Sequence, residues 1–350
     1  MPHTISASAI LRQLRADLIG KDSYRGVTLT YSWLANQFGH FGLGFIPAFI
    51  VYKILLLWWT AREAALWAAL GVSFAWLAFE IINFLGPLLS HKQEKQKRTA
   101  KGDYTFQPAW GNVAFDTTTD VLFFSLGAFT ASVLLYWSSL TFIVVMILLL
   151  ILIYPSYYWY VTKLYLQTAQ YPFHFRLSQW NFEMPDDKKE IIHQFKNNKD
   201  DGMHLLIFGA KGCGKTSLGV AVATEHSIIH RCCIYTTGIK LYGLFFDPFS
   251  GKKEKKDPLW NWRSCTTLVI DDINPGEPVK DDIVSPRSFI RFLDNYGNGN
   301  QVNRDTLKKT NVIWILGTEV QPANTAGKWK QMLLNELGID ENKILCLYLN

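Results

Sequence analysis

The hydrophobic pattern divides the chain into an apolar half and a mixed half. Residues 41–161 are mostly apolar, whereas the stretches before and after them carry most of the Lys, Asp and Glu. Within this region, four apolar segments are long enough, or nearly so, to cross a hydrocarbon layer of about 30 Å at about 1.5 Å per residue. We expect four membrane spans at Phe41–Trp59, Ala64–Leu89, Thr119–Tyr136 and Leu140–Val161. The alternative is a set of buried helices in a large soluble core, which the nearly uncharged run LTFIVVMILLLILIYP disfavours.

The second half alternates short apolar runs with segments of helical pattern. The runs lie at 205–208, 232–235, 267–270, 311–316 and 344–349. This alternation predicts a doubly wound, mostly parallel five-stranded sheet whose ligand lies at the carboxyl ends of the strands. We therefore expect a bundle of four spans followed by an α/β domain. The expected divisions are a cytoplasmic segment (1–36), a transmembrane domain (37–162), a linker with a leading helix (163–200) and the α/β domain (201–350). Within the linker, the aromatic run YPFHFRLSQWNFEM favours a strand or an interfacial segment.

A glycine-rich motif follows the first predicted strand of the α/β domain. In HLLIFGAKGCGKTSL, Gly209, Gly214, Lys215 and Thr216 fill the spacing G-x-x-x-x-G-K-[ST] of a P-loop. Glycines let backbone N–H groups converge on phosphate oxygens, and the following helix directs its positive end at the same anion. Lys215 is expected to reach the β- and γ-phosphates, and the Thr216 hydroxyl to hold Mg²⁺. A chance glycine turn is the alternative, which the preceding strand and the helix-forming SLGVAVATEH disfavour.

This motif predicts that the cofactors are ATP and Mg²⁺. The residues expected to surround the nucleotide are Gly209, Ala210, Lys211, Gly212, Cys213, Gly214, Lys215, Thr216 and Ser217.

A later predicted strand ends in acidic residues, and hydrolysis requires such carboxylates. The run Thr267–Asp272 is apolar and ends in paired carboxylates, about 55 residues after Lys215. Asp271 is expected to contact the Mg²⁺ shell, and Asp272 to polarise the attacking water. A strand that merely ends in an acidic turn is the alternative.

Together these motifs resemble the AAA+/ASCE ATPase core over residues 186–350, with helicase-loader-like (IstB/DnaC-like) proteins and membrane-associated KAP NTPases as comparisons. The resemblance implies that Thr318, at the tip of the strand 311–316, senses the γ-phosphate. It also implies that Arg291 or Arg304 reaches a neighbouring subunit as an arginine finger, in a homo-oligomer; a solvated surface arginine is the alternative. The chain ends at the fifth strand, so the helical lid of that family is not expected. No LSGGQ-like signature is present, which argues against a transporter ATPase, and no N/T-K-x-D motif follows the acidic strand, which argues against a GTPase.

Charge and cysteine content bear on location. The net charge is +6, and much of it lies in short runs beside the apolar segments. Basic residues gather in the N-terminal segment and between the second and third spans, so the positive-inside rule places both termini and the 91–118 loop in the cytoplasm. We therefore expect a multi-pass protein of the inner, cytoplasmic membrane whose nucleotide motif faces the cytosol. All five cysteines follow residue 212 without metal-ligand spacing, which favours reduced thiols. The run GKKEKKD (251–257) is expected to form an exposed loop, with contact to anionic lipid or nucleic acid as the alternative.

Four ionisable residues lie in or beside the spans: His40, Glu80, Asp116 and Asp120. Their depths predict convergence on the cytoplasmic side. A carboxylate in hydrocarbon needs a partner, so they form either a polar or metal-binding site or a network that fastens the helices. The runs HFGLGF, FEIINF and NVAFDTTTDVLFFSLGA resemble the VanZ-like membrane family over residues 36–130. That resemblance implies little about activity.

Three functions remain open. The leading hypothesis is a membrane-anchored cytosolic ATPase that binds and hydrolyses Mg-ATP to switch or assemble a membrane complex; a defence or mobile-element system suits such a fusion. In the second, the His/Glu/Asp site in the membrane carries enzymatic or ion-handling activity, and the nucleotide domain regulates it. In the third, the chain is a membrane recruitment scaffold for a protein or nucleic-acid partner, and nucleotide is only structural.

Overall fold

The chain forms two compact units. The computed structural model describes residues 5–19, 26–96, 105–180, 182–198, 201–246, 259–273, 285–294, 300–317 and 322–349. The helical unit comprises Gln13–Asp103 and Pro108–Lys163, and the α/β unit comprises Met1–Arg12, Tyr104–Gln107 and Leu164–Asn350. A short piece of the connection between two membrane helices thus belongs to the α/β unit.

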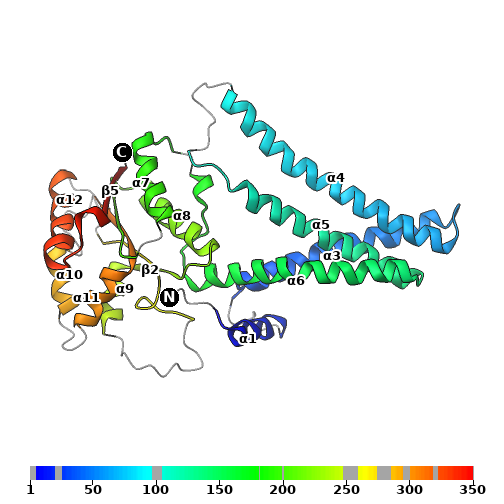
Figure 1. The fold of residues 1–350 in the computed structure, drawn as a ribbon, viewed down its shortest axis with the longest axis horizontal. Helices are drawn as coiled ribbons and strands as arrows, with labels where there is room; N and C mark the ends of the chain where they lie inside the picture. Colours follow the sequence, from blue (N-terminus) through cyan, green and yellow to red (C-terminus); the bar gives the residue numbers. More distant parts are fainter. Residues whose placement is uncertain are drawn as a thin grey trace. The chain divides into compact units, whose positions relative to one another are not determined.

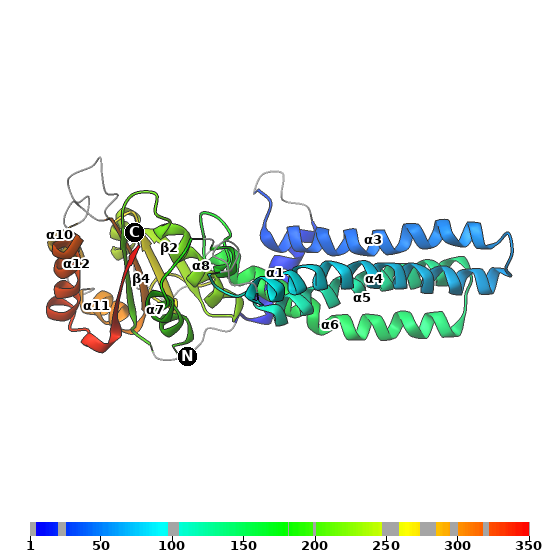
Figure 2. The same cartoon turned by 90° about the horizontal axis from the view of Figure 1, so that it is seen from above.

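Four long helices build the helical unit (Figures 1 and 2). They are α3 (Leu29–Leu55), α4 (Ala61–Gln96), α5 (Trp110–Leu135) and α6 (Ser139–Thr168), and the short α1 (Ala7–Leu18) precedes them. The part of α1 up to Arg12 and the part of α6 from Leu164 belong to the α/β unit. Each of the four long helices contains a stretch long and apolar enough to cross a membrane, and in α4 that stretch is Ala61–Leu89. The prediction of four apolar membrane helices is therefore confirmed.

The expected starts of the first and third spans are wrong. α3 begins at Leu29 rather than at Phe41, and α5 begins at Trp110 rather than at Thr119. The Thr28 side chain accepts a hydrogen bond from the Tyr31 amide at 3.2 Å and so caps α3. Hydropathy missed these first turns because they mix polar residues into the apolar pattern, whereas a helix continues wherever its backbone bonds are made.

Glycines set the distance between α3 and α5. A Cβ atom on Gly44 would lie 1.9 Å from the Phe124 carbonyl oxygen, and one on Gly127 would lie 2.0 Å from that of Phe41. Small residues allow such close backbone approach between membrane helices. Trp76 of α4 joins the pair, because its ring stacks on Phe124 with centroids 4.2 Å apart.

A parallel sheet is the core of the α/β unit, as predicted. Its strands are β1 (His204–Gly209), β2 (Cys233–Thr237), β3 (Thr267–Asp271), β4 (Asn311–Gly317) and β5 (Ile344–Leu349). They are all parallel, in the order β2-β3-β4-β1-β5. Gly209 pairs with Gly317 on one side and with Leu349 on the other, so three strands end level beside the glycine-rich loop.

Helices cover both faces of this sheet. They are α7 (Asp186–Asn197), α8 (Lys215–Ile228), α9 (Gly238–Phe245), α10 (Pro286–Asp294), α11 (Asn300–Lys309) and α12 (Pro322–Gln331). Side chains of α7 and α8 share a buried core with Leu205 and Ile207. In β4, Ile313 and Ile315 belong to that core. Trp314 lies between them and points to the opposite face of the sheet, because side chains alternate along a strand. It packs against Phe289 of α10 and Trp329 of α12. All five cysteines are free, and three of them are buried.

Candidate functional site

The loop between β1 and α8 depends on glycine. Gly212 and Gly214 have φ angles of +85° and +90°, in the left-handed region that other residues rarely adopt. Gly209 is needed for space, because a Cβ atom there would lie 2.4 Å from Cys213 Sγ and 2.8 Å from the Leu349 carbonyl oxygen. The exposed tip consists of Ala210, Lys211 and Gly212. Gly214 caps α8, whose first amides have no partner within the helix and present its positive end.

Lys215 folds back over this loop. Its Nζ donates hydrogen bonds to the carbonyl oxygens of Gly209 at 2.8 Å and Ala210 at 2.7 Å. Partial burial lowers the pKa of Lys215, and the nearby Cys213 and Asp271 oppose that shift. The Lys215 ammonium group is thus held beside a loop whose backbone amides favour an anion.

Asp271 ends β3 as a buried carboxylate. It is 3% exposed and accepts hydrogen bonds from the Tyr235 hydroxyl and the Asp272 amide, both at 2.8 Å. The electrostatic interaction between Asp271 and Lys215 brings the two predicted motifs together. Asp272 is exposed, with a left-handed φ of +49°. Desolvation and the adjacent Asp271 raise the pKa of Asp272.

The donors for a metal ion come from different elements. Thr216 and Ser217 are half-buried in the first turn of α8. Thr318 lies outside the described residues, directly after Gly317. In the part of the chain that is described, no group of three or more His, Cys, Asp or Glu side chains could hold a metal ion. One hydroxyl and one carboxylate, with phosphate oxygens completing the shell, are the kind of donor set that Mg²⁺ takes in nucleotide sites.

The two candidate arginine fingers differ in their surroundings. Arg304 forms an ion pair with Asp294, at 2.7 Å from Nη2 to Oδ2, and also donates to the Glu336 carbonyl oxygen. Its guanidinium is therefore engaged within its own chain. Arg291 is exposed on α10.

Two aromatic residues that the sequence did not assign to the site pack against the loop. A Cβ atom on Gly214 would lie 2.7 Å from the Trp180 ring and 3.4 Å from the Phe182 ring. Trp180 is 2% exposed, and its ring centroid is 4.9 Å from that of Phe182. The expected strand is wrong: residues 171–180 and 182–184 are irregular apart from a short 3-10 turn at Leu177–Gln179, and the alternative of an interfacial segment stays a prediction. The aromatic run was visible in the sequence, but its contact with Gly214 was not.

The connection between α4 and α5 contacts the aromatic residues that pack against the loop. Thr105 Oγ1 donates to the Phe182 carbonyl oxygen at 2.6 Å. Phe106 is 2% exposed in the core that contains Trp180, and its ring centroid is 5.8 Å from that of His193. Only residues 107–109 separate this buried side chain from the start of α5.

The chain directly after α6 is hydrogen-bonded to β2, the strand that pairs with β3. The Ala169 carbonyl oxygen, directly after α6, accepts a hydrogen bond from the Tyr235 amide at 2.8 Å. The hydroxyl of the same tyrosine holds Asp271.

All four ionisable residues of the spans converge. His40 Nε2 lies 3.4 Å from Asp120 Oδ1, and Asn36 Nδ2 lies 2.8 Å from His40 Nε2. Glu80 and Asp116 are close enough to Asp120 to interact with it electrostatically. His40 lies inside α3 rather than at its start, and Asp120 likewise lies inside α5.

Comparison with protein families corrects both family resemblances. Residues 18–141 match a family described as "Predicted membrane protein (DUF2238)". The membrane half therefore does not match the VanZ-like family, and no AAA+/ASCE or other P-loop ATPase family is matched either. Short runs such as those used for the two resemblances recur in unrelated families, which explains the error. No curated protein matches the chain. The matched family and the four candidate spans make this chain a membrane protein.

Proposed function

We propose that this membrane protein binds ATP with Mg²⁺ on the loop 209–217 and uses it to switch or assemble a membrane complex. One observation carries the proposal. Two left-handed glycines wrap the positive end of α8 while Lys215 and Asp271 face the same loop. Oriented amides, a helix N-terminus and a lysine together favour a polyphosphate.

The residues divide the work as follows. The loop amides bind the phosphates, and Lys215 exchanges its two carbonyl partners for phosphate oxygens. Thr216 and Asp271 would hold Mg²⁺, which neutralises charge on the phosphates. Asp272 is exposed, and its raised pKa makes it a stronger base for positioning and polarising the attacking water.

Two routes support a relay from the loop to the membrane helices. In the first, Gly214 contacts Trp180 and Phe182, and Phe182 is bonded to Thr105 shortly before α5. In the second, Asp271 is bonded to Tyr235, whose amide bonds to the chain directly after α6. A ligand can shift a conformational equilibrium only through contacts that differ between the states. Both routes begin at residues that would contact the nucleotide or its metal.

Orientation and assembly belong to the same proposal. Basic residues flanking the spans favour a multi-pass protein of the inner membrane with the loop in the cytosol. The exposed Arg291 suits contact with a neighbouring copy, whereas the ion pair of Arg304 with Asp294 opposes such a role.

The polar cluster in the spans supports a second candidate, in which it carries ion-handling activity that the nucleotide unit regulates. The observation in its favour is the approach of His40 Nε2 to within 3.4 Å of Asp120 Oδ1, beside two further carboxylates. Charged groups at membrane depth are costly and are often functional. Glu80→Gln should then abolish ion flux in proteoliposomes and leave nucleotide binding intact; unchanged flux would assign the cluster to helix packing.

The test of the leading proposal is equilibrium binding of mant-ATP to the full chain in nanodiscs, with and without Mg²⁺. Lys215→Ala should weaken binding about 10- to 100-fold, since a hydrogen bond to a charged group contributes about 1.5–3 kcal/mol. Lys189→Ala, which removes a half-buried lysine paired with the exposed Asp186 on α7, is the control and should bind normally.

Phosphate release separates the remaining possibilities. Wild-type protein should release phosphate, and Asp272→Asn should reduce the rate while binding persists. Binding without release in the wild type would favour nucleotide as a structural ligand of a recruitment scaffold. Equal mant-ATP affinity of wild type and Lys215→Ala would refute the proposed site.

A further inference from the structure

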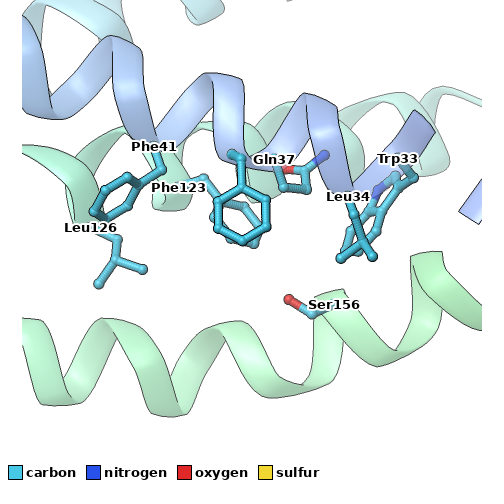
Figure 3. A pocket seen from close by; sticks show the side chains of 8 residues that line it. Trp33, Leu34, Gln37, Phe41, Phe123, Leu126 and Ser156 are labelled. Carbon is cyan, nitrogen blue, oxygen red and sulfur yellow. The ribbon is translucent and has the colours of Figure 1, made fainter. Parts of the chain in front are cut away.

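A groove runs between α3, α5 and α6, within the candidate spans. Its volume is about 290 Å³, near the lower end of the range for small-molecule sites. Figure 3 shows its walls, with Ser156 of α6 facing a row of α3 side chains. The lining residues are Trp33, Leu34, Gln37, Phe38, Phe41, Phe123, Leu126 and Ser156.

Two polar atoms on the α3 wall lack hydrogen-bond partners. Among the described residues, Gln37 Oε1 and Trp33 Nε1 are both buried without one, and their residues are only 4% and 8% exposed. The first is an acceptor and the second a donor. Residues four apart lie on the same face of a helix, so both side chains belong to the same wall. Both atoms are covered by protein, so the Gln37 and Trp33 side chains must turn before one small polar group can reach them. In hydrocarbon no bulk water compensates for such atoms.

Carboxylates flank these two atoms. Tyr160 packs edge-on against Trp33 and donates to the buried Asp17 at 2.8 Å. The Gln37 side chain hydrogen-bonds to Asp120. None of the described residues that line the groove is a Lys or Arg. This electrostatic setting repels an anionic headgroup. An ammonium group could not accept a hydrogen bond from Trp33 Nε1, so a neutral hydroxyl is the group that matches both atoms.

The wall is preformed on the α3 side. The glycine contacts of Gly44 with Phe124 and of Gly127 with Phe41 hold α3 and α5 together directly beside the groove. A ligand therefore does not have to organise these helices, which lowers the cost of binding.

We infer that the groove binds a single-chain neutral lipid from the bilayer through a hydroxyl group. The hydroxyl donates to Gln37 Oε1 and accepts from Trp33 Nε1. The apolar chain lies along Phe41, Phe123 and Leu126. A volume this small accommodates one chain rather than a two-chain phospholipid. This inference does not depend on the proposed nucleotide site.

The test is photocapture by the full chain in phosphatidylcholine nanodiscs. The probe is a monoacylglycerol with a diazirine in its acyl chain, and labelled peptides are mapped by mass spectrometry. Wild-type protein should be labelled on α3, α5 or α6 beside the groove. Gln37→Leu should reduce labelling about tenfold, since it removes one well-buried hydrogen bond.

Two further arms keep the result interpretable. A probe with methylated hydroxyls should lose about tenfold on wild type and little more on Gln37→Leu, because both changes remove the same bond. Ser156→Trp should block capture by filling the groove. Leu150→Trp, on an exposed residue of α6 outside the lining, should not.

Equal labelling of wild type and Gln37→Leu would overturn the inference. So would labelling confined to surfaces away from the groove. Cysteine cross-linking that shows a second copy of the chain seated in the groove, with no probe captured there, would overturn it as well.

Discussion

Gly212 and Gly214 form a matched pair that isolates the contact between the loop and Trp180. Both have left-handed φ angles, +85° and +90°. A Cβ atom on Gly212 would meet nothing within 4 Å, whereas one on Gly214 would lie 2.7 Å from the Trp180 ring. Alanine at either position therefore incurs similar backbone strain, of about 1–2 kcal/mol. Only Gly214→Ala also drives a methyl group into a buried ring.

The difference between the two variants can be estimated. Overpacking a well-packed site costs about 1–3 kcal/mol. In a domain of this size, 1 kcal/mol lowers Tm by roughly 2–4 °C. Gly214→Ala should therefore lower the Tm of the α/β unit by roughly 2–12 °C more than Gly212→Ala does.

The assay must report the α/β unit alone, because a chain of two units does not unfold in one step. Thermal proteolysis of the full chain in nanodiscs, read by mass spectrometry of peptides from β1 and β4, meets this requirement. The double variant Gly214→Ala/Trp180→Ala should show a coupling of about 1 kcal/mol or more, because the second change removes the clash introduced by the first. Equal Tm values for Gly212→Ala and Gly214→Ala, with no coupling to Trp180, would refute the packing argument.

Three other outcomes are expected. Burial, aided by the charge of Arg231, lowers the pKa of His226 to about 4. The stability of the α/β unit should therefore be full above pH 6.5 and fall by about 3 kcal/mol as pH drops to about 4, because between these pH values the imidazole is protonated mainly in the unfolded state. Urea unfolding of His226→Gln, followed by proteolysis of peptides from β1 and β4, should lack this slope. Gly44→Val should separate α3 from α5 and cut the yield of folded protein in size-exclusion chromatography, while Gly42→Val, with nothing within 4 Å, should behave as wild type. Phe106→Ala should abolish any effect of ATP on hydrogen exchange at the start of α5 while mant-ATP still binds; persistence of that effect would exclude this route of the relay.

Local pattern was sufficient for much of this protein. Hydropathy predicted four membrane helices because a helix satisfies its own backbone hydrogen bonds and needs only an apolar surface in lipid. The apolar runs around residues 205–208 and 311–316 predicted buried parallel strands, because such strands are covered on both faces. The glycine spacing before Lys215 predicted a turn that the structure contains, with left-handed angles at Gly212 and Gly214.

Tertiary structure decided what lies beside these elements. Neither hydropathy nor spacing predicts that Trp180 covers Gly214, or that Thr105 and Phe106 leave the membrane helices to pack in the α/β unit. The helix starts at Leu29 and Trp110 also escaped prediction, because caps and packing extend helices through polar turns. Local pattern depends on the residue and its near neighbours along the chain, whereas these contacts join residues that only the completed fold brings together. The amino-acid order therefore determined the helices, the strands and the glycine loop. Packing determined which side chains lie against that loop.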